Sequence, residues 1–158
     1  MKVGELCRRE VATIDGDESV AAAARRMRDA RVDQLIVVER GGGGVRPVGV
    51  VTERDLVVSV LADEGADPAK LQIGTLVRDG FASVTVDEDL DETLHRMRSF
   101  EARRLPVIDR SGHVHGVVTL DDVLAAIRRE VDAGTLAQHR RRASEVLHRG
   151  PHGRTRGA

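Results

Sequence analysis

The chain has 158 residues, enough for one domain or for two small ones that share a core. Apolar residues make up 41% and charged residues 32%, and the formal net charge is −1, so we expect neither a disordered polyelectrolyte nor a membrane-inserted protein. Aromatic residues make up 1%, with no Trp or Tyr, which excludes an aromatic platform for single-stranded nucleic acid and an aromatic cage.

The N-terminal region carries the single cysteine, Cys7, which cannot form an intramolecular disulfide. The first ten residues lack the apolar core of a signal peptide, so we expect a cytoplasmic protein. At Cys7 a core position is favoured over a reactive thiol. No Ser, Cys or His stands in a recognisable nucleophile setting, so we expect no catalytic residues and no enzyme.

An internal repeat organises the chain. Residues 3–40 align with residues 73–110 at a constant offset of 70, with 12 identities in 38 positions. After this block the offset falls to 67, so the first copy carries a three-residue insertion, which lies in the four glycines 41–44. A loosened hairpin is favoured there over a phosphate-binding loop, because no Gly-Lys-Ser/Thr and no helix follow.

Each copy shows the same order of predicted elements. A short extended piece (12–14 or 82–84) precedes a helix whose start is marked by residues 17–19 or 87–89. Two apolar runs follow, at 35–38 and 48–51 in the first copy and at 105–108 and 114–118 in the second, and they predict a strand pair. A second helix begins at Thr52 or Thr119 and is expected to end near Gly65 or Gly134. The pattern predicts two βαββα units of the α/β (α+β) class. Because 60 residues are marginal alone, the two units should pack sheet to sheet with pseudo-twofold symmetry.

Two polar clusters invite a metal-site hypothesis. The acidic run 87–92 is better explained as a helix start. His113 and His115 lie two apart on a predicted strand and face the same side, but no third ligand is evident nearby. We therefore expect no metal site.

The doubled unit and two of its phrases resemble a known family. Residues 48–55 (Val-Gly-Val-Val-Thr-Glu-Arg-Asp) and 104–109 (Arg-Leu-Pro-Val-Ile-Asp) are similar to cystathionine-β-synthase-type (CBS) regulatory domains, and a pair of these resembles a Bateman module. The resemblance covers about residues 3–131. It implies a non-catalytic sensor that binds AMP, ADP, ATP, NAD or S-adenosylmethionine between the copies, with AMP or ATP favoured as the regulatory ligand. It also implies a homodimer and an effector protein of unknown identity.

The resemblance divides the chain into four parts: repeat 1 (1–64), a linker (65–72), repeat 2 (73–131) and an arginine-rich tail (132–158). The tail carries six arginines against Asp132 and Glu145, a net charge of +4. Its first part is expected to extend the last helix, and residues from 150 onward are expected to be disordered. A solvated terminus is favoured over a nucleic-acid contact, so we do not expect nucleic acid as a partner.

Two clefts between the copies follow from the resemblance, each combining the Thr-x-x-Asp of one copy with a strand of the other. The Thr stands where a strand meets a helix and can hold a phosphate, and the Asp one turn later can accept hydrogen bonds from ribose. The alternative is a helix cap with a first-turn carboxylate. The first cleft would use Thr13, Ile14, Val51, Thr52, Arg54, Asp55, Arg103, Arg104 and Pro106. The second would use Ser83, Val84, Thr119, Asp122, Gln34 and Ile36.

The two clefts are not expected to be equivalent. Arg54, Arg103 and Arg104 could converge on a phosphate in the first, although Arg103 and Arg104 could instead be solvated strand-edge charges. The second would lack arginines and present carboxylates, Asp122 among them, that repel phosphate. The sequence thus predicts one strong nucleotide site and a second that is weak, empty or tuned to an uncharged nucleoside. A ligand-free interaction scaffold and a nucleic-acid-associated protein that acts through the tail remain the alternatives.

Overall fold

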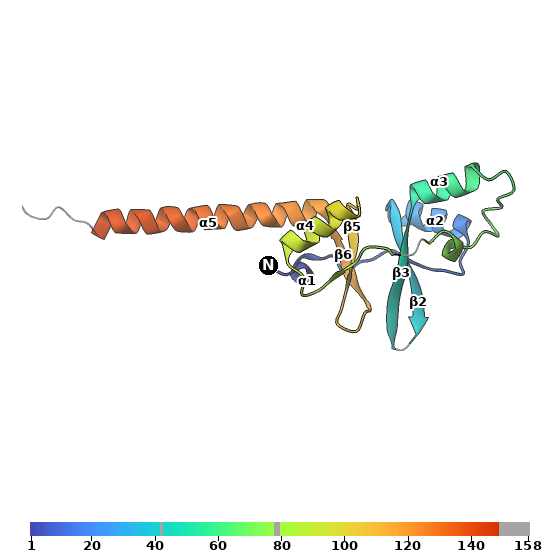
Figure 1. Cartoon of the computed structure of the whole chain (residues 1–158), viewed down its shortest axis with the longest axis horizontal. Coiled ribbons are helices and arrows are strands. Elements are labelled where there is room, and N and C mark those ends of the chain that lie inside the picture. The colour runs from blue at the N-terminus through green and yellow to red at the C-terminus, as the bar shows by residue number, and fades with distance from the viewer. Residues whose placement is uncertain (42, 78–79, 149–158) are drawn as a thin grey trace, which may run out of the picture. The chain divides into compact units, whose positions relative to one another are not determined.

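The computed structural model describes residues 1–41, 43–77 and 80–148 (Figure 1). The chain divides into two compact units, residues 1–123 and residues 124–158. The first unit holds two three-stranded sheets with their helices, which confirms the predicted mixed α and β class. Within the described residues, no helix has an apolar stretch that could cross a lipid bilayer.

The first repeat forms a βαββα unit. Its elements are β1 (Thr13–Asp15), α2 (Val20–Ala30), β2 (Gln34–Gly41), β3 (Gly44–Thr52) and α3 (Glu53–Leu61). Strand β2 lies in the centre of the sheet, parallel to β1 and antiparallel to β3. Gly41 pairs with Gly44 at the end of the β2–β3 ladder, so the insertion of the first copy lies in a hairpin, as predicted.

The second repeat forms the same unit with the same strand order. Its elements are β4 (Val84–Thr85), α4 (Leu90–Ser99), β5 (Arg104–Ile108), β6 (Val114–Thr119) and α5 (Leu120–His148). Both sheets even share a ladder irregularity at the same repeat position, between Val37 and Val38 and between Val107 and Ile108. The prediction of two βαββα repeats is confirmed.

Helix α5 departs from the prediction, because it continues through Gly134 to His148. A glycine within a helix costs about 1 kcal/mol relative to alanine, but it ends the helix only where the backbone turns left-handed, and Gly134 has no positive φ. The end predicted near Gly134 is therefore wrong, and the start of the tail is helical. Residues 149–158, which include the whole segment expected to be disordered, lie outside the described residues.

The starts of α2 and α4 differ although their sequences are related. Ser19 caps α2 with its side chain, which accepts a 3.2 Å hydrogen bond from the amide of Ala22. Asp89 occupies the same position before α4, but its carboxylate accepts a 2.9 Å hydrogen bond from Lys2 instead. The predicted helix starts are thus confirmed, while the side-chain cap forms only in the first copy.

A core beneath the first sheet combines residues of both repeats. It is built from alternating side chains of β1 and β2, the apolar side of α2, and Ile73 from the short 3-10 helix η1 (Ile73–Thr75) that begins the second repeat. Its buried members are Ile14, Val20, Ala23, Met27, Leu35, Val37, Val51, Leu56 and Ile73. The participation of Ile73 means that the first repeat does not close its core alone.

The two repeats exchange their first segments. The amide of Gly74 donates to the carbonyl of Gly16 (2.7 Å), and the amide of Gly4, in α1 (Val3–Leu6), donates to the carbonyl of Val86 (3.0 Å). Gly4 and Gly74 are related by the offset of 70, and so are Gly16 and Val86, so the same bond forms twice. Helix α1 accordingly lies beside β6, in the sheet of the other repeat (Figure 1). This exchange gives the first unit its pseudo-twofold relation and brings residues 3–8 to the second repeat.

Candidate functional site

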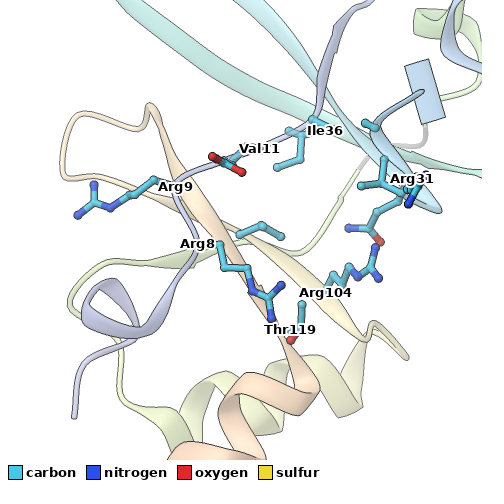
Figure 2. Close-up of a pocket in the computed structure, with 13 residues that line it drawn as sticks. Arg8, Arg9, Val11, Arg31, Ile36, Arg104 and Thr119 are labelled. Atoms are coloured by element: carbon cyan, nitrogen blue, oxygen red, sulfur yellow. The ribbon is translucent and has the colours of Figure 1, made fainter. Parts of the chain in front are cut away.

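A cavity of about 1020 Å³ lies where the two repeats meet within the first unit. Its volume is typical of pockets that take a small molecule or cofactor. The first repeat lines it with the segment before β1, the end of α2 and the start of β2, and the second repeat lines it with β5 and β6 (Figure 2). The lining residues are Arg8, Arg9, Glu10, Val11, Ala12, Ala30, Arg31, Val32, Gln34, Ile36, Arg104, Val117 and Thr119.

The lining combines positive charge with an apolar wall. Four of the residues are arginines and only one, Glu10, is a carboxylate. Figure 2 shows the Arg8 side chain extended toward Thr119, with Val11 and Ile36 on another side of the cavity. Such a lining suits a ligand with an anionic end and a flat apolar end, because guanidinium groups bind phosphate with charge-assisted hydrogen bonds.

At the strand-to-helix junction, Thr119 and Asp122 form a reciprocal pair. The Thr119 hydroxyl donates a 2.6 Å hydrogen bond to Asp122 Oδ2, and the amide of Asp122 donates a 3.2 Å bond to the same hydroxyl. The second carboxylate oxygen, Oδ1, accepts a 3.0 Å bond from Arg8 Nη2. Partial burial alone would raise the pKa of Asp122, but the hydrogen bonds from Thr119 and Arg8 outweigh it and lower that pKa. Asp122 is therefore an ionised carboxylate at neutral pH.

The prediction that this cleft lacks arginines is wrong. Arg8 reaches it because residues 3–8 lie on the second repeat, where the Arg8 amide donates to the Val117 carbonyl (2.9 Å). Arg104 reaches it because β5 pairs with β6 in a register that sets Arg104 opposite Thr119. Sequence reasoning placed Arg104 in the other cleft and did not single out Arg8, Arg9 or Arg31.

The Thr52–Asp55 junction has the same local geometry. The amide and hydroxyl of Thr52 donate to Asp55 Oδ2 (2.9 and 2.7 Å), and the Asp55 amide donates to the Thr52 hydroxyl (3.2 Å). The repeat counterpart of Arg8 on this side is Arg78, which lies outside the described residues. In both Thr-x-x-Asp motifs, the Thr and the Asp thus bond to each other as a helix cap, as the alternative interpretation expected. The cap holds each carboxylate in place at the start of a helix.

The arginines predicted for the Asp55 cleft lie elsewhere. Arg54 and Arg103 are exposed, and in the described part of the chain neither forms an ion pair with Asp55. The Arg104 guanidinium donates to Asp33, the residue before β2, and thereby joins the two repeats. Among the arginines predicted as a convergent set, only Arg104 lines the described cavity.

The remaining predicted site residues divide by burial. Gln34 and Ile36 line the cavity, as the resemblance implied. The side chains of Ile14, Val51 and Val84 are buried in the sheets' cores, so only their backbone groups could reach a ligand. Three others do not line the cavity: Thr13 of β1, whose carbonyl accepts from Arg26 (2.7 Å), half-buried Ser83 directly before β4, and buried Pro106 of β5.

His115 of β6 and His113, the residue before β6, lie near other polar side chains. His115 Nδ1 lies 3.0 Å from Arg9 Nη1, and His113 Nδ1 lies 3.9 Å from a carboxylate oxygen of Asp109. Across residues 1–41, 43–77 and 80–148, no three His, Cys, Asp or Glu side chains are grouped so that they could hold a metal ion.

Comparison with known proteins decides the family. The model of the CBS domain matches the chain twice, over residues 3–62 and 73–129, so the matches span the whole first βαββα unit and the second unit as far as residue 129 in α5. The chain belongs to the CBS domain family. As a CBS domain pair it is a regulatory module, and its cavity lies between the two CBS repeats.

Relatives of known sequence support this membership. The chain is 34% identical to Hypoxic response protein 1 of Mycobacterium tuberculosis over 113 residues, which cover 72% of this chain and 76% of that protein. It is 35% identical to protein YlbB of Bacillus subtilis over 118 residues, which cover 75% of this chain and 76% of the relative. Another relative, from Methanopyrus kandleri, is 31% identical over 124 residues, and the match spans only 61% of its length.

Solved structures of CBS pairs share the fold. The structure of Hypoxic Response Protein I with two coordinated zinc ions has a TM-score of 0.70 at 29% identity and covers 80% of this chain and 98% of that one. The cytosolic domain of the Mg²⁺ channel MgtE in complex with ATP has a TM-score of 0.67 at 28% identity and covers 79% of this chain and 48% of that one.

Proposed function

We propose that this CBS pair is a non-catalytic sensor that binds an adenine nucleotide in the cavity at Thr119 and signals to a partner protein. The observation that carries the proposal is the meeting of four arginines and an apolar wall in one cavity of about 1020 Å³, with the ionised carboxylate of Asp122 bonded to two of its lining residues, Arg8 and Thr119. A CBS neighbour solved in complex with ATP supports the ligand class.

Each part of a nucleotide has a counterpart in the cavity or directly beside it. Arg8, Arg31 and Arg104 would bind phosphate oxygens, and Asp122 would accept hydrogen bonds from ribose hydroxyls. The base would lie against Val32, Ile36, Val117 and the backbone, because the lining contains no aromatic residue. Several guanidinium groups are best satisfied by more than one phosphate, which favours ATP or ADP over AMP. Cationic S-adenosylmethionine would be repelled.

The Asp55 cleft is the second candidate site. It presents the same prepositioned Thr52–Asp55 pair, and Arg54 lies exposed in the first turn of α3. A ligand there would be held by the same ribose and phosphate contacts. The number of nucleotides bound per chain therefore shows whether one cleft or both are occupied. An Asp55→Ala variant and an Asp122→Ala variant, titrated in parallel, assign each binding event to its cleft.

A second copy of the chain is the first partner that we infer. Helix α3 exposes the apolar side chains of Val57, Val58 and Leu61, and Leu61 is 78% exposed. Soluble monomers rarely leave such a group of neighbouring apolar side chains in water, so pairing of α3 with another molecule would bury them. A homodimer formed there, together with an effector protein, would carry the signal.

Isothermal titration calorimetry with AMP, ADP, ATP, NAD and S-adenosylmethionine tests the ligand proposal. ATP or ADP is expected to bind most tightly, and Arg104→Ala should weaken that binding by about tenfold, the effect of one lost charge-assisted hydrogen bond. Arg110→Ala is the matched control, because Arg110 is also an ion-paired arginine of the second repeat but pairs with Asp87 outside the cavity. Equal effects of the two variants would contradict the placement of the site.

The absence of binding would favour the alternatives. A chain that binds none of the five compounds and carries none of them through purification would be better described as an interaction scaffold. Because it lacks Trp and Tyr, a copurified nucleotide would dominate its near-ultraviolet absorbance. Nucleic-acid binding through the arginine-rich tail would instead be salt-dependent and lost on truncation after Asp132.

A further inference from the structure

The carboxylate expected to bind ribose already has a partner on each oxygen. Asp122 Oδ2 accepts from the Thr119 hydroxyl, and Asp122 Oδ1 accepts from Arg8 Nη2 at 3.0 Å. The Thr119 bond belongs to the helix start and fixes the carboxylate. The Arg8 bond comes from the other repeat, and it occupies the oxygen that a ribose hydroxyl would otherwise approach.

Arg8 combines a fixed backbone with a free side chain. Its amide and its carbonyl both bond to Val117, each at 2.9 Å, so the backbone is held on β6 like an added strand residue. Its side chain is nevertheless 66% exposed, whereas that of Asp122 is 19% exposed. The guanidinium can therefore leave Asp122 by side-chain rotation alone, without moving the segment that lines the cavity.

We propose that Arg8 determines which class of adenine ligand the cavity accepts, by exchanging Asp122 for a phosphate group when a nucleotide binds. A phosphorylated ligand gives Arg8 a new anionic partner as ribose takes its place on Asp122. An uncharged ligand such as adenosine displaces Arg8 from Asp122 without providing a new anionic partner for its guanidinium group. The exchange rests on the proposed nucleotide site, and it makes the cavity discriminate against nucleosides.

The second arginine of the cavity provides a built-in comparison. Arg104 is paired with Asp33, which has no part in the proposed ribose contact, so a ligand need not compete with Arg104 for its partner. Removal of Arg104 should weaken phosphate binding only. Removal of Arg8 should weaken phosphate binding and, at the same time, free Asp122 for the ribose of an uncharged ligand. Of the two substitutions, only that of Arg8 is therefore expected to change the affinity for adenosine.

Calorimetric titration with ATP, adenosine and tripolyphosphate tests this exchange. The proteins are the full-length chain and its Arg8→Ala, Arg104→Ala and Arg110→Ala variants. Arg8→Ala is expected to weaken ATP and tripolyphosphate by about tenfold and to tighten adenosine by about threefold, the worth of one exposed ion pair. Arg104→Ala should weaken ATP and tripolyphosphate without tightening adenosine, and Arg110→Ala should change none of the three.

Adenosine binding that is unchanged or weaker in Arg8→Ala, while the chain still binds ATP, would overturn the exchange and leave the proposed nucleotide site standing. If neither ATP nor adenosine binds to the chain or to Arg8→Ala, the nucleotide site and the exchange both fall. Should Arg8→Ala fold poorly by circular dichroism, Arg8→Gln removes the charge but keeps the packing of the stem, and the same two criteria apply.

Discussion

Gly116 of β6 packs directly against Cys7 at the end of α1, because a Cβ atom at Gly116 would lie 2.8 Å from Cys7 Sγ and 2.6 Å from the carbonyl oxygen of Arg8. The same contact recurs in the first sheet, where a Cβ at Gly49 would clash with Cγ1 of Val77. Gly49 and Gly116 are therefore the positions at which each sheet accepts the exchanged segment of the other repeat.

Gly116→Ala is expected to destabilise the fold by about 2 kcal/mol, the usual cost of forcing extra volume into a packed site. The obstacle is a backbone carbonyl, which cannot rotate away as a side-chain end can. Urea denaturation followed by circular dichroism at 222 nm measures the effect. Gly41→Ala is the matched control, because Gly41 has no positive φ and no atom lies within 4 Å of its Cβ position. An unchanged midpoint in Gly116→Ala would contradict the tight contact.

The thiol of Cys7 is expected to react slowly. Burial raises the pKa of this thiol, and the nearby positive charge of Arg9 lowers it by less, so little thiolate exists at pH 7. Alkylation by iodoacetamide should be about tenfold slower in the folded chain than in urea, and it reports on this site alone because the chain has one cysteine. Gly116→Ala should accelerate the reaction by loosening the segment. Equal rates in buffer and in urea would show that the segment does not protect the thiol.

The local elements of the fold could be predicted from the sequence, but its long-range contacts could not. Periodicity and helix-start residues predicted the order of elements in both copies, because these signals are local. The helix end predicted near Gly134 was wrong because glycine alone does not dictate a helix end, whereas the expected extension of the last helix into the tail is confirmed. The exchange of segments was missed because it depends on hydrogen bonds such as Gly4 to Val86, between residues 82 positions apart, which no local pattern encodes.

The candidate site could likewise be predicted only in part from the sequence. Thr119, Asp122, Gln34 and Ile36 could be placed from the motif and the family resemblance. Arg8 could not, because its partner lies 114 residues away. A signal was nevertheless present: Arg8 recurs at position 78, and Asp122 recurs at position 55, so both copies carry an arginine near their start and a carboxylate at the start of their last helix. Other repeated residues, such as Glu18 with Arg26, are structural ion pairs, so recurrence alone does not identify a ligand site.

The repeated Glu–Arg pair permits a comparison between the two copies. Glu18 with Arg26 and Glu88 with Arg96 occupy equivalent positions, but the Glu88 side chain is only 7% exposed and that of Glu18 is 28% exposed. Arg96→Ala is expected to cost about 3 kcal/mol because it leaves a buried carboxylate unpaired, whereas Arg26→Ala should cost less because water can reach Glu18. Urea denaturation of both variants measures the difference.

A second substitution, at Glu88, separates the charge of Arg96 from the packing of its side chain. Adding Glu88→Gln to Arg96→Ala should recover part of the lost stability, since an uncharged amide is cheaper to bury than an isolated carboxylate. A double variant that is no more stable than Arg96→Ala would show that packing of the Arg96 stem, rather than its charge, determines the loss.

The pH dependence of stability should reveal the Arg8–Asp122 pair. The pKa of Asp122 is lowered in the folded chain, so the carboxylate stabilises the fold above its unfolded pKa of about 3.9, and this contribution is lost as the pH falls through the lower folded value. Arg8→Ala removes one cause of the lowering. The difference in stability between the chain and Arg8→Ala should be greatest near pH 7 and vanish toward pH 2. Direct titration of the Asp122 carboxyl carbon by NMR should give a higher pKa in Arg8→Ala, and an identical value in both proteins would rule out the pairing in solution.

The exposed apolar side of α3 makes the inferred homodimer testable. Leu61→Asp places a charge among Val57, Val58 and Leu61, so it should shift the chain toward the monomer in sedimentation velocity if α3 pairs with a second copy. Leu61 is 78% exposed within one chain, and its substitution should therefore leave the urea midpoint of the monomer nearly unchanged. Glu53→Lys, at the exposed first residue of the same helix, provides a charge change outside the apolar group. A dimer that survives Leu61→Asp would place the pairing surface on other elements, because a desolvated carboxylate at the centre of an apolar contact costs more than such a contact gains.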